Sequence, residues 1–302
     1  MNNAQTVLKH LESAGFHAAF FPYHCIDRIK NHYDSLVEKN PGVKRTQSAV
    51  DYFRKHYQSD LPFKPFSFLV AAFPDNPAQI VLHIDGRPTA IPIPPTYRNF
   101  EIMGKHLEEL IKTAANGCQT ANPSGISQKL LAVLGGLGRY GRNNICYIDG
   151  LGSWFHLRAF CTDIPCDDVS HPLRFLDECE GCGLCKQNCP TGVIGEYPVI
   201  DTSRCLTMLN ENKNPMPDWV PADVHHAAIG CLRCQENCPV NKTLPAKPVD
   251  TLEFDVAETR DLLSLEPGTL PPELAEKLKQ FKLHEFSFGV IGRNAKLAMQ
   301  NI

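Results

Sequence analysis

The sequence has no excess of charge of either sign. Its 30 lysines and arginines stand against 33 aspartates and glutamates, and the formal net charge is −3 over 302 residues. A chain with this balance lacks the broad positive field that draws in nucleic acid or an anionic membrane. A nucleic-acid substrate would therefore have to be held by local contacts.

Long apolar runs are also missing. Purely apolar stretches such as Phe68–Phe73 reach six residues, against about 20 for a membrane-spanning helix. The opening MNNAQTVLKH has no basic stretch followed by an apolar one, as a secretory signal would. No GxGxxG follows a predicted strand and no GxxxxGKS/T occurs in the first half, which argues against a Rossmann site or a P-loop. We expect a cytoplasmic protein without a membrane span.

Periodicity predicts a mixed layer of helices and strands over about the first 165 residues, and the length suggests roughly two domains. Two short apolar runs, separated by prolines, are typical of two neighbouring strands joined by a turn. The expected elements are helices within residues 1–60 and over 100–112 and 126–134, and strands at 66–73, 78–84 and 145–148.

Cysteine, by contrast, is abundant and unevenly placed. Eight of the 13 cysteines lie between Cys179 and Cys238. A disulfide scaffold is excluded because such chains are short and secreted, whereas this one is long, lacks a signal and has an odd cysteine number. The other five cysteines are expected to be small buried hydrophobic residues: Cys25, Cys118, Cys146, Cys161 and Cys166.

The eight clustered cysteines have the spacing of iron-sulfur ligands. Residues 179–190 read CxxCxxCxxxCP, in which the fourth cysteine ligates a second cluster. Residues 231–239 repeat the CxxC and CP elements, and a further cysteine lies between the two motifs. We therefore assign one [4Fe-4S] cluster to Cys179, Cys182, Cys185 and Cys238, and the other to Cys189, Cys205, Cys231 and Cys234. A pair of zinc knuckles is the alternative, since CxxC pairs also bind zinc.

A second unusual stretch is GGLGRYGRNN at residues 135–144. Closely spaced glycines let a backbone approach a large flat or anionic ligand, and the arginines and asparagines offer donors. The alternative is a glycine-rich turn with solvated arginines.

With these motifs, the sequence resembles the epoxyqueuosine reductase family, the cobalamin-dependent iron-sulfur enzymes of tRNA queuosine synthesis. The matching blocks are GLGRYGRNN, GSWF, Thr162-Asp163, CEGCGLCKQNCPTGVIG, IDTSRC, GCLRCQENCPVN and FGVIGRNAKLAMQN. They cover most of the chain from about residue 95 onward and keep the family's order.

This resemblance implies an α+β fold, with an N-terminal, nitroreductase-like α/β layer that binds cobalamin, followed by a ferredoxin-like double-cluster domain. The domains would be residues 1–166, residues 167–248 and a C-terminal helical segment, 249–302, that packs back on the core. A base-off cobalamin would lie against Gly136, Gly138, Tyr140, Arg142, Asn143, Ser153 and Trp154. Core packing is the alternative for Trp154 and its neighbour Phe155.

The sequence departs from the family at two places. Asn122 stands where family members carry a proton-donating aspartate, and an asparagine does not deliver a proton, so Tyr97 is the replacement candidate. The chain ends at Ile302, where longer members continue into helical repeats that help to hold tRNA. Together with the net charge, this argues against tRNA as the substrate.

Three functions follow from this pattern. The first is a cobalamin-dependent reductase in which electrons pass through both clusters to cobalt, with epoxyqueuosine in tRNA as the substrate that the resemblance implies. The second is a reductive dehalogenase-like enzyme for small molecules, and the third is an electron-transfer protein or reductive activator without its own substrate. A monomer served by a low-potential donor such as flavodoxin or ferredoxin is expected.

Overall fold

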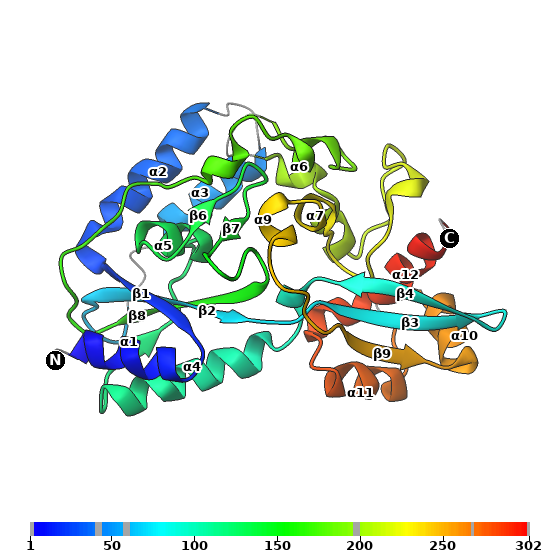
Figure 1. Cartoon of the computed structure of the whole chain (residues 1–302), viewed down its shortest axis with the longest axis horizontal. Coiled ribbons are helices and arrows are strands. Elements are labelled where there is room, and N and C mark those ends of the chain that lie inside the picture. The colour runs from blue at the N-terminus through cyan, green and yellow to red at the C-terminus, as the bar shows by residue number, and fades with distance from the viewer. Residues whose placement is uncertain (1–2, 40–43, 57–60, 196–199, 267–268, 301–302) are drawn as a thin grey trace. The chain divides into compact units, whose positions relative to one another are not determined.

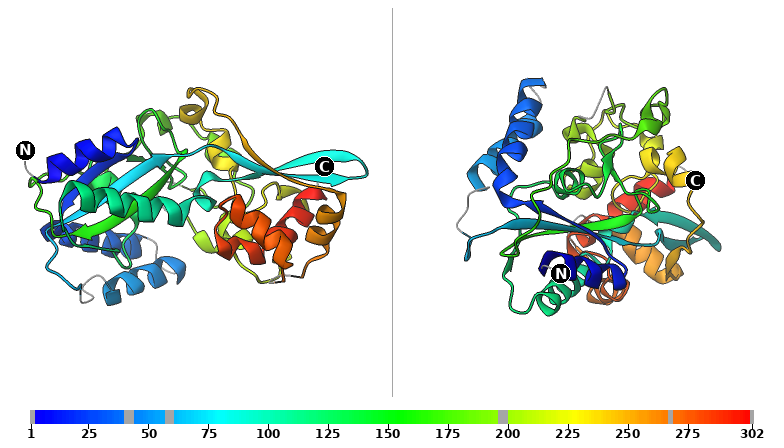
Figure 2. Two further views of the ribbon diagram at one scale, coloured as in Figure 1. Left: turned by 90° about the horizontal axis from the view of Figure 1, so that it is seen from below. Right: turned by 60° about the vertical axis from the view of Figure 1, so that its left-hand side comes forward.

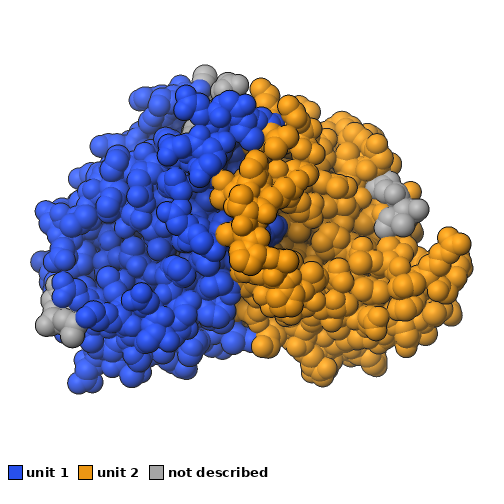
Figure 3. Space-filling model, viewed as in Figure 1, with its two compact units in different colours: residues 1–74, 102–183, 194–201 blue, residues 75–101, 184–193, 202–302 orange. Residues whose placement is uncertain are grey.

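The computed structural model describes residues 3–39, 44–56, 61–195, 200–266 and 269–300, with the backbone alone for residues 44–49. The chain forms two compact units, coloured separately in Figure 3. Unit 1 comprises residues 1–74, 102–183 and 194–201, and unit 2 comprises residues 75–101, 184–193 and 202–302. Both units contain helices and strands, which confirms the predicted α+β class.

The units are not consecutive in the chain, in contrast to the predicted segments 1–166, 167–248 and 249–302. The physical reason lies in one strand pairing. Strand β3 (Ala78–Ile84) is parallel to β9 (Asp250–Phe254), so residues from the N-terminal third are held with the C-terminal segment.

Unit 1 is built on a sheet of four antiparallel strands (Figure 1). Its strands are, in order across the sheet, β1 (His17–Pro22), β2 (Ser67–Pro74), β8 (Phe155–Thr162) and β5 (Thr120–Ala121). Helices α1 (Asn3–Ser13) and α4 (Phe100–Ala114) cover one face, and α2 (Ile26–Lys39), α3 (Lys44–His56) and α5 (Gln128–Leu134) cover the other (Figures 1 and 2).

The position of strand β2 in the middle of unit 1 explains why its sequence is apolar at every position after Ser67. Phe68, Val70 and Ala72 point into the core formed with α2, α3 and α5, whereas Leu69 and Ala71 point into the core formed with α1 and α4. Successive side chains of a strand face opposite sides of the sheet, so a strand covered on both faces needs no polar alternation. A two-stranded sheet, β6 (Arg139–Tyr140) with β7 (Cys146–Tyr147), completes the unit.

Unit 2 contains a three-stranded sheet in the order β4 (Arg87–Ile93), β3, β9. Its core is formed with α10 (Val256–Ser264), α11 (Pro272–Gln280) and α12 (Ile291–Met299). Four shorter helices lie in the cysteine-rich part of the chain: α6 (Leu184–Gln187), α7 (Leu206–Glu211), α8 (Arg233–Glu236) and α9 (Pro239–Lys242).

The two apolar runs predicted as neighbouring strands are both strands, but their predicted pairing is wrong. Strand β2 lies between β1 and β8, whereas β3 lies between β4 and β9. Both hydrogen-bonding edges of each strand are therefore used by other partners, so the residues between them connect two sheets and form no hairpin.

The five scattered cysteines are not equally buried. Cys146 and Cys161 are buried, as predicted, whereas Cys25, Cys118 and Cys166 keep part of their surface exposed. Among the helices of the described residues, none has both the length and the apolar character that a bilayer span requires.

Candidate metal centres and cofactor loop

The second predicted cysteine set lies within unit 2. Cys205 caps the N-terminus of α7, Cys234 lies on α8, and Cys231 lies just before α8. Cys189 follows α6, and its backbone N–H donates to the carbonyl of Lys186 at 3.3 Å. Short helices separated by cysteine-bearing loops are suited to an organising metal group rather than to a large apolar core.

Three of these thiols are close enough to interact electrostatically. Burial raises the pKa of Cys231 to about 12, and the nearby Cys205 and Cys189 raise it further. Burial likewise raises the pKa of Cys205, with Cys189 as a contributing neighbour. Buried thiols of this kind become thiolates when a metal ion or a metal cluster lies among them.

The first cysteine of the other set contacts the glycine-rich stretch within unit 1. The backbone N–H of Arg142 donates to the Cys179 sulfur at 3.4 Å, and its Nη2 donates to the Cys179 carbonyl at 3.2 Å. Cys179 itself ends the 3₁₀ helix Asp177–Cys179. Hydrogen bonds to ligand sulfurs are among the factors that set cluster potentials. The structure thus brings together two features that the sequence marked separately.

The glycines of this stretch are required by the packing of the loop itself. A β-carbon on Gly136 would lie 2.5 Å from the ring of His171, and one on Gly138 would lie 2.5 Å from the sulfur of Cys146. Gly136 also has a φ of +81°, a conformation that L-residues rarely adopt. Close approach of a ligand is therefore not needed to explain these two residues.

The predicted cobalamin residues of unit 1 fall into two groups. Tyr140, Asn143 and Ser153 are buried, and the Asn143 side chain donates to the Tyr147 hydroxyl at 2.9 Å. Arg142 and Trp154 are half-buried and keep surface available to a ligand. Of these five side chains, Arg142 and Trp154 are thus the two that present surface to a ligand, whereas the buried three shape the loop itself.

Tyr97 lies beside the second cysteine set. It is 6% exposed, its hydroxyl donates to Glu211 Oε1 at 2.5 Å, and its ring fills the space that a β-carbon on Gly230 would take. Burial raises the pKa of Tyr97 well above its usual value, with Glu211, Cys205 and Cys231 contributing. The sequence pattern does not predict Glu211 as the partner of Tyr97, because 114 residues separate the two.

Asn122 belongs to unit 1 and is exposed just after β5. It borders a cavity of about 20 Å³ together with Tyr23, His56, Phe68 and Cys161. That volume is about the size of one water molecule.

The cysteine-rich segment matches a known family model. Residues 178–241 match the family described as "4Fe-4S double cluster binding domain", and all eight clustered cysteines lie within this range. The prediction of two iron-sulfur clusters is thereby confirmed, and the protein is an iron-sulfur protein of the double-cluster class.

The chain is also similar to curated relatives and to solved structures. The epoxyqueuosine reductase of Staphylococcus aureus is 30% identical over 161 residues, which cover 52% of this chain and 38% of that protein. The epoxyqueuosine reductase of Leadbetterella byssophila is 27% identical over 75% of this chain and 68% of that protein. A solved epoxyqueuosine reductase with an epoxyqueuosine-modified tRNA-Tyr stem loop has a TM-score of 0.66 at 19% identity, covering 98% of this chain and 80% of that one.

These matches confirm the predicted resemblance to the epoxyqueuosine reductase family. The matched region spans about a third of the length of the first curated relatives. The solved structure, at its low identity, confirms the fold alone.

Proposed function

We propose that the chain is an iron-sulfur oxidoreductase that acts like an epoxyqueuosine reductase, with two [4Fe-4S] clusters and a bound cobalamin. The observation that carries this proposal is the double-cluster segment, whose first cysteine is hydrogen-bonded by Arg142 of the predicted cofactor loop. A ferredoxin that only carries electrons needs neither such a loop nor a second layer of helices and strands. A reductase needs both, because it must also hold a cofactor and a substrate.

The ligand assignment in this proposal follows the swapped pattern of two-cluster ferredoxins. Cys189, Cys205, Cys231 and Cys234 would hold one cluster, and their shared unit and electrostatic contacts support this set. The other cluster would be held by Cys179, Cys182, Cys185 and Cys238.

Cobalamin would be held in part by Arg142 and Trp154, the two candidate side chains of the loop region with exposed surface. When bound, cobalamin supplies a cobalt centre that accepts single electrons and acts as a strong nucleophile. Arg142 would orient the loop against Cys179 through its backbone N–H, and the Trp154 ring would provide an apolar wall.

Tyr97 is better suited to shielding the second cluster from water than to donating a proton to a substrate. Its hydroxyl is buried and committed to Glu211, so it holds its proton rather than releasing it. In our proposal the Tyr97–Glu211 pair keeps the surroundings of Cys205 and Cys231 dry and rigid. Proton delivery to a substrate would then come from another group, with Asn122 positioning the substrate by its amide.

The substrate that we propose is epoxyqueuosine in tRNA, which is supported by the tRNA stem loop held by the solved relative. Electrons would come from a cytoplasmic flavodoxin or ferredoxin. An electron carrier without its own substrate is the second candidate, because an asparagine at position 122 leaves no carboxylate there.

The deciding experiment is anaerobic purification, reconstitution with iron and sulfide, and addition of cobalamin, followed by metal analysis and optical and electron paramagnetic spectra. We expect about eight irons and one base-off cobalamin per chain. Trp154→Ala is expected to weaken cobalamin binding about tenfold, while Trp219→Ala, which removes the other, exposed tryptophan, leaves it unchanged.

A preparation with full iron but no cobalamin affinity would overturn the reductase and leave the electron carrier. If cobalamin binds, turnover of epoxyqueuosine-modified tRNA, compared with turnover of a halogenated phenol, separates the tRNA reductase from a dehalogenase-like enzyme.

A further inference from the structure

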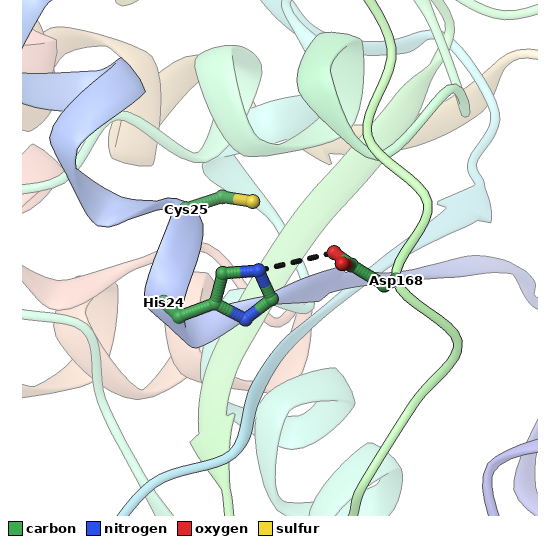
Figure 4. Close-up of side chains that lie close together, drawn as sticks. All are labelled: His24, Cys25 and Asp168. Carbon is green, nitrogen blue, oxygen red and sulfur yellow. Dashed lines mark ion pairs between the residues drawn. The ribbon is translucent and has the colours of Figure 1, made fainter.

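A cluster of three metal-binding side chains lies in unit 1, apart from the eight clustered cysteines in sequence. His24 and Cys25 are adjacent in the 3₁₀ helix Tyr23–Cys25, and Asp168 comes from the segment after β8. One ligand atom from each residue lies within 4.8 Å of the other two, and the side chains point towards a common space (Figure 4). His24 Nε2 is 3.0 Å from Asp168 Oδ1.

The segment that carries Asp168 is fixed on both sides of it. On the N-terminal side, the Ser67 hydroxyl donates to the carbonyl of Ile164 at 2.8 Å. On the C-terminal side, Arg28 donates to the Ser170 hydroxyl and, at 2.6 Å, to the carbonyl of His171. Arg28 lies in the first turn of α2, directly after the helix that bears His24 and Cys25. The two segments, about 140 residues apart, are therefore held together without any metal.

An ion pair alone does not account for this arrangement. The His24 and Asp168 side chains are 66% and 76% exposed, and an exposed ion pair contributes little to stability.

The donor types decide which cation is bound. Thiolate and imidazole are ligands of zinc and related transition metals, whereas magnesium and calcium take oxygen ligands. We propose that His24, Cys25 and Asp168 form a zinc site, with a water molecule as the fourth ligand. The site joins the entry of α2 to the segment that follows β8. It does not depend on the proposed reductase function.

The test uses the fully reconstituted protein, so that the cluster cysteines are occupied by iron. Zinc chloride is added, excess metal is removed by gel filtration, and the zinc K-edge absorption is recorded, which detects zinc without interference from iron. We expect one zinc per chain with sulfur scatterers at about 2.3 Å and nitrogen or oxygen scatterers at about 2.0 Å. Zinc affinity is measured by competition with a chromophoric chelator.

Three variants separate this site from other thiols. Cys25→Ser and Asp168→Asn are each expected to lower the zinc affinity about 100-fold, because each removes a ligand. Cys118→Ser, which changes another half-buried cysteine of unit 1, is expected to bind zinc as the unchanged protein does. Iron content serves as the folding control, and Asp168→Asn alters only an exposed side chain.

Retention of full affinity in Cys25→Ser and Asp168→Asn would overturn the proposal, as would failure of the eight-iron protein to retain zinc. Sulfur-only coordination would also overturn it, because that would place zinc in the ferredoxin-type cysteines. None of these outcomes affects cobalamin binding, so this proposal and the proposed function fail separately.

Discussion

Arg98 carries its charge into the core of unit 2, where it is 7% exposed. Its Nη1 donates to Asp250 at 2.6 Å, its Nε donates to the carbonyl of Phe281 at 3.1 Å, and its guanidinium lies 4.2 Å from the centre of the Phe281 ring. These partners compensate the burial of the positive charge. Removal of the carboxylate would leave the charge buried and uncompensated, which lowers the free energy of unfolding.

Asp250→Ala is therefore expected to lower the free energy of unfolding by about 2 kcal/mol, a value reduced because Asp250 itself is 39% exposed. The matched control is Asp149→Ala, which removes an 89% exposed partner of Arg139 and should cost less than about 1 kcal/mol. Thermal unfolding followed by circular dichroism measures both. Equal losses would contradict the distinction between the buried and the exposed arginine.

His226 makes stability depend on pH. The backbone N–H of Leu232 donates to its Nε2 at 3.3 Å, and its Nδ1 lies 3.2 Å from the carbonyl of Val224, so the neutral ring satisfies both contacts. Burial, with a smaller effect from Arg233, lowers the pKa of His226 from 6.5 to about 4. Between pH 4 and pH 6.5, the unfolded chain therefore binds a proton at His226 that the folded chain does not bind.

The stabilisation by neutral His226 is accordingly complete above about pH 6.5 and is lost as the pH falls towards 4. Wild-type stability should decline below pH 6.5 with a contribution of up to about 1.4 kcal/mol per pH unit. His226→Gln should remove that contribution, whereas His17→Gln, at an exposed position, should keep it. Denaturant titrations between about pH 7.5 and 5.5 provide the comparison, and parallel curves for all three proteins would refute it.

At the scale of elements, helix α12 approaches α10 through a glycine. A β-carbon on Gly292 would lie 2.5 Å from the carbonyl oxygen of Leu262, which belongs to the backbone and yields little. The glycine in α4 differs, because a β-carbon on Gly104 would meet the guanidinium of Arg158, the far end of a flexible side chain.

Gly292→Ala should therefore reduce the free energy of unfolding by about 1–2 kcal/mol, since overpacking outweighs the better helix propensity of alanine. Gly104→Ala should cost less than that, because Arg158 can move aside. Unfolding midpoints of the two variants decide between these outcomes, and a more stable Gly292→Ala protein would show that α10 and α12 are not in tight contact.

The elements also show where sequence patterns are sufficient. The strand predicted at 78–84 has the observed bounds of β3, and the run at 66–73 is shifted by one residue in β2. Strand β4 escaped prediction because it contains Pro88 and Pro92, which an edge strand tolerates since its outer backbone groups need no partner. Strand β9 is short and polar, and only its parallel pairing with β3 reveals it.

At the scale of the whole molecule, the eight cysteines are the part of the candidate site that local spacing could predict. Contacts between residues far apart in the sequence leave no local sequence pattern from which they could be predicted. The hydrogen bond from Arg142 to Cys179 joins residues 37 apart, and the bond from Tyr97 to Glu211 joins residues 114 apart. His24 and Asp168 were not singled out for the same reason.

The swapped ligand pattern makes a whole-chain prediction. Cys234→Ala is expected to lower the iron content from about eight to about four per chain, because one cluster loses a ligand while the other keeps all four. Iron and acid-labile sulfide are measured after anaerobic reconstitution, with Cys118→Ala as the control that keeps the full content. An unchanged iron content in Cys234→Ala would contradict the assignment of Cys234 as a cluster ligand.

The parallel pairing of β3 with β9 also has a consequence during synthesis. Ala78 is opposite Asp250, and a ribosome that adds about 5–20 residues per second needs on the order of 10–30 s to span that interval. Until β9 emerges, one edge of β3 has no partner, and an open edge invites pairing with other chains. Nascent chains stalled before residue 250 should therefore depend on chaperones far more than the completed chain does.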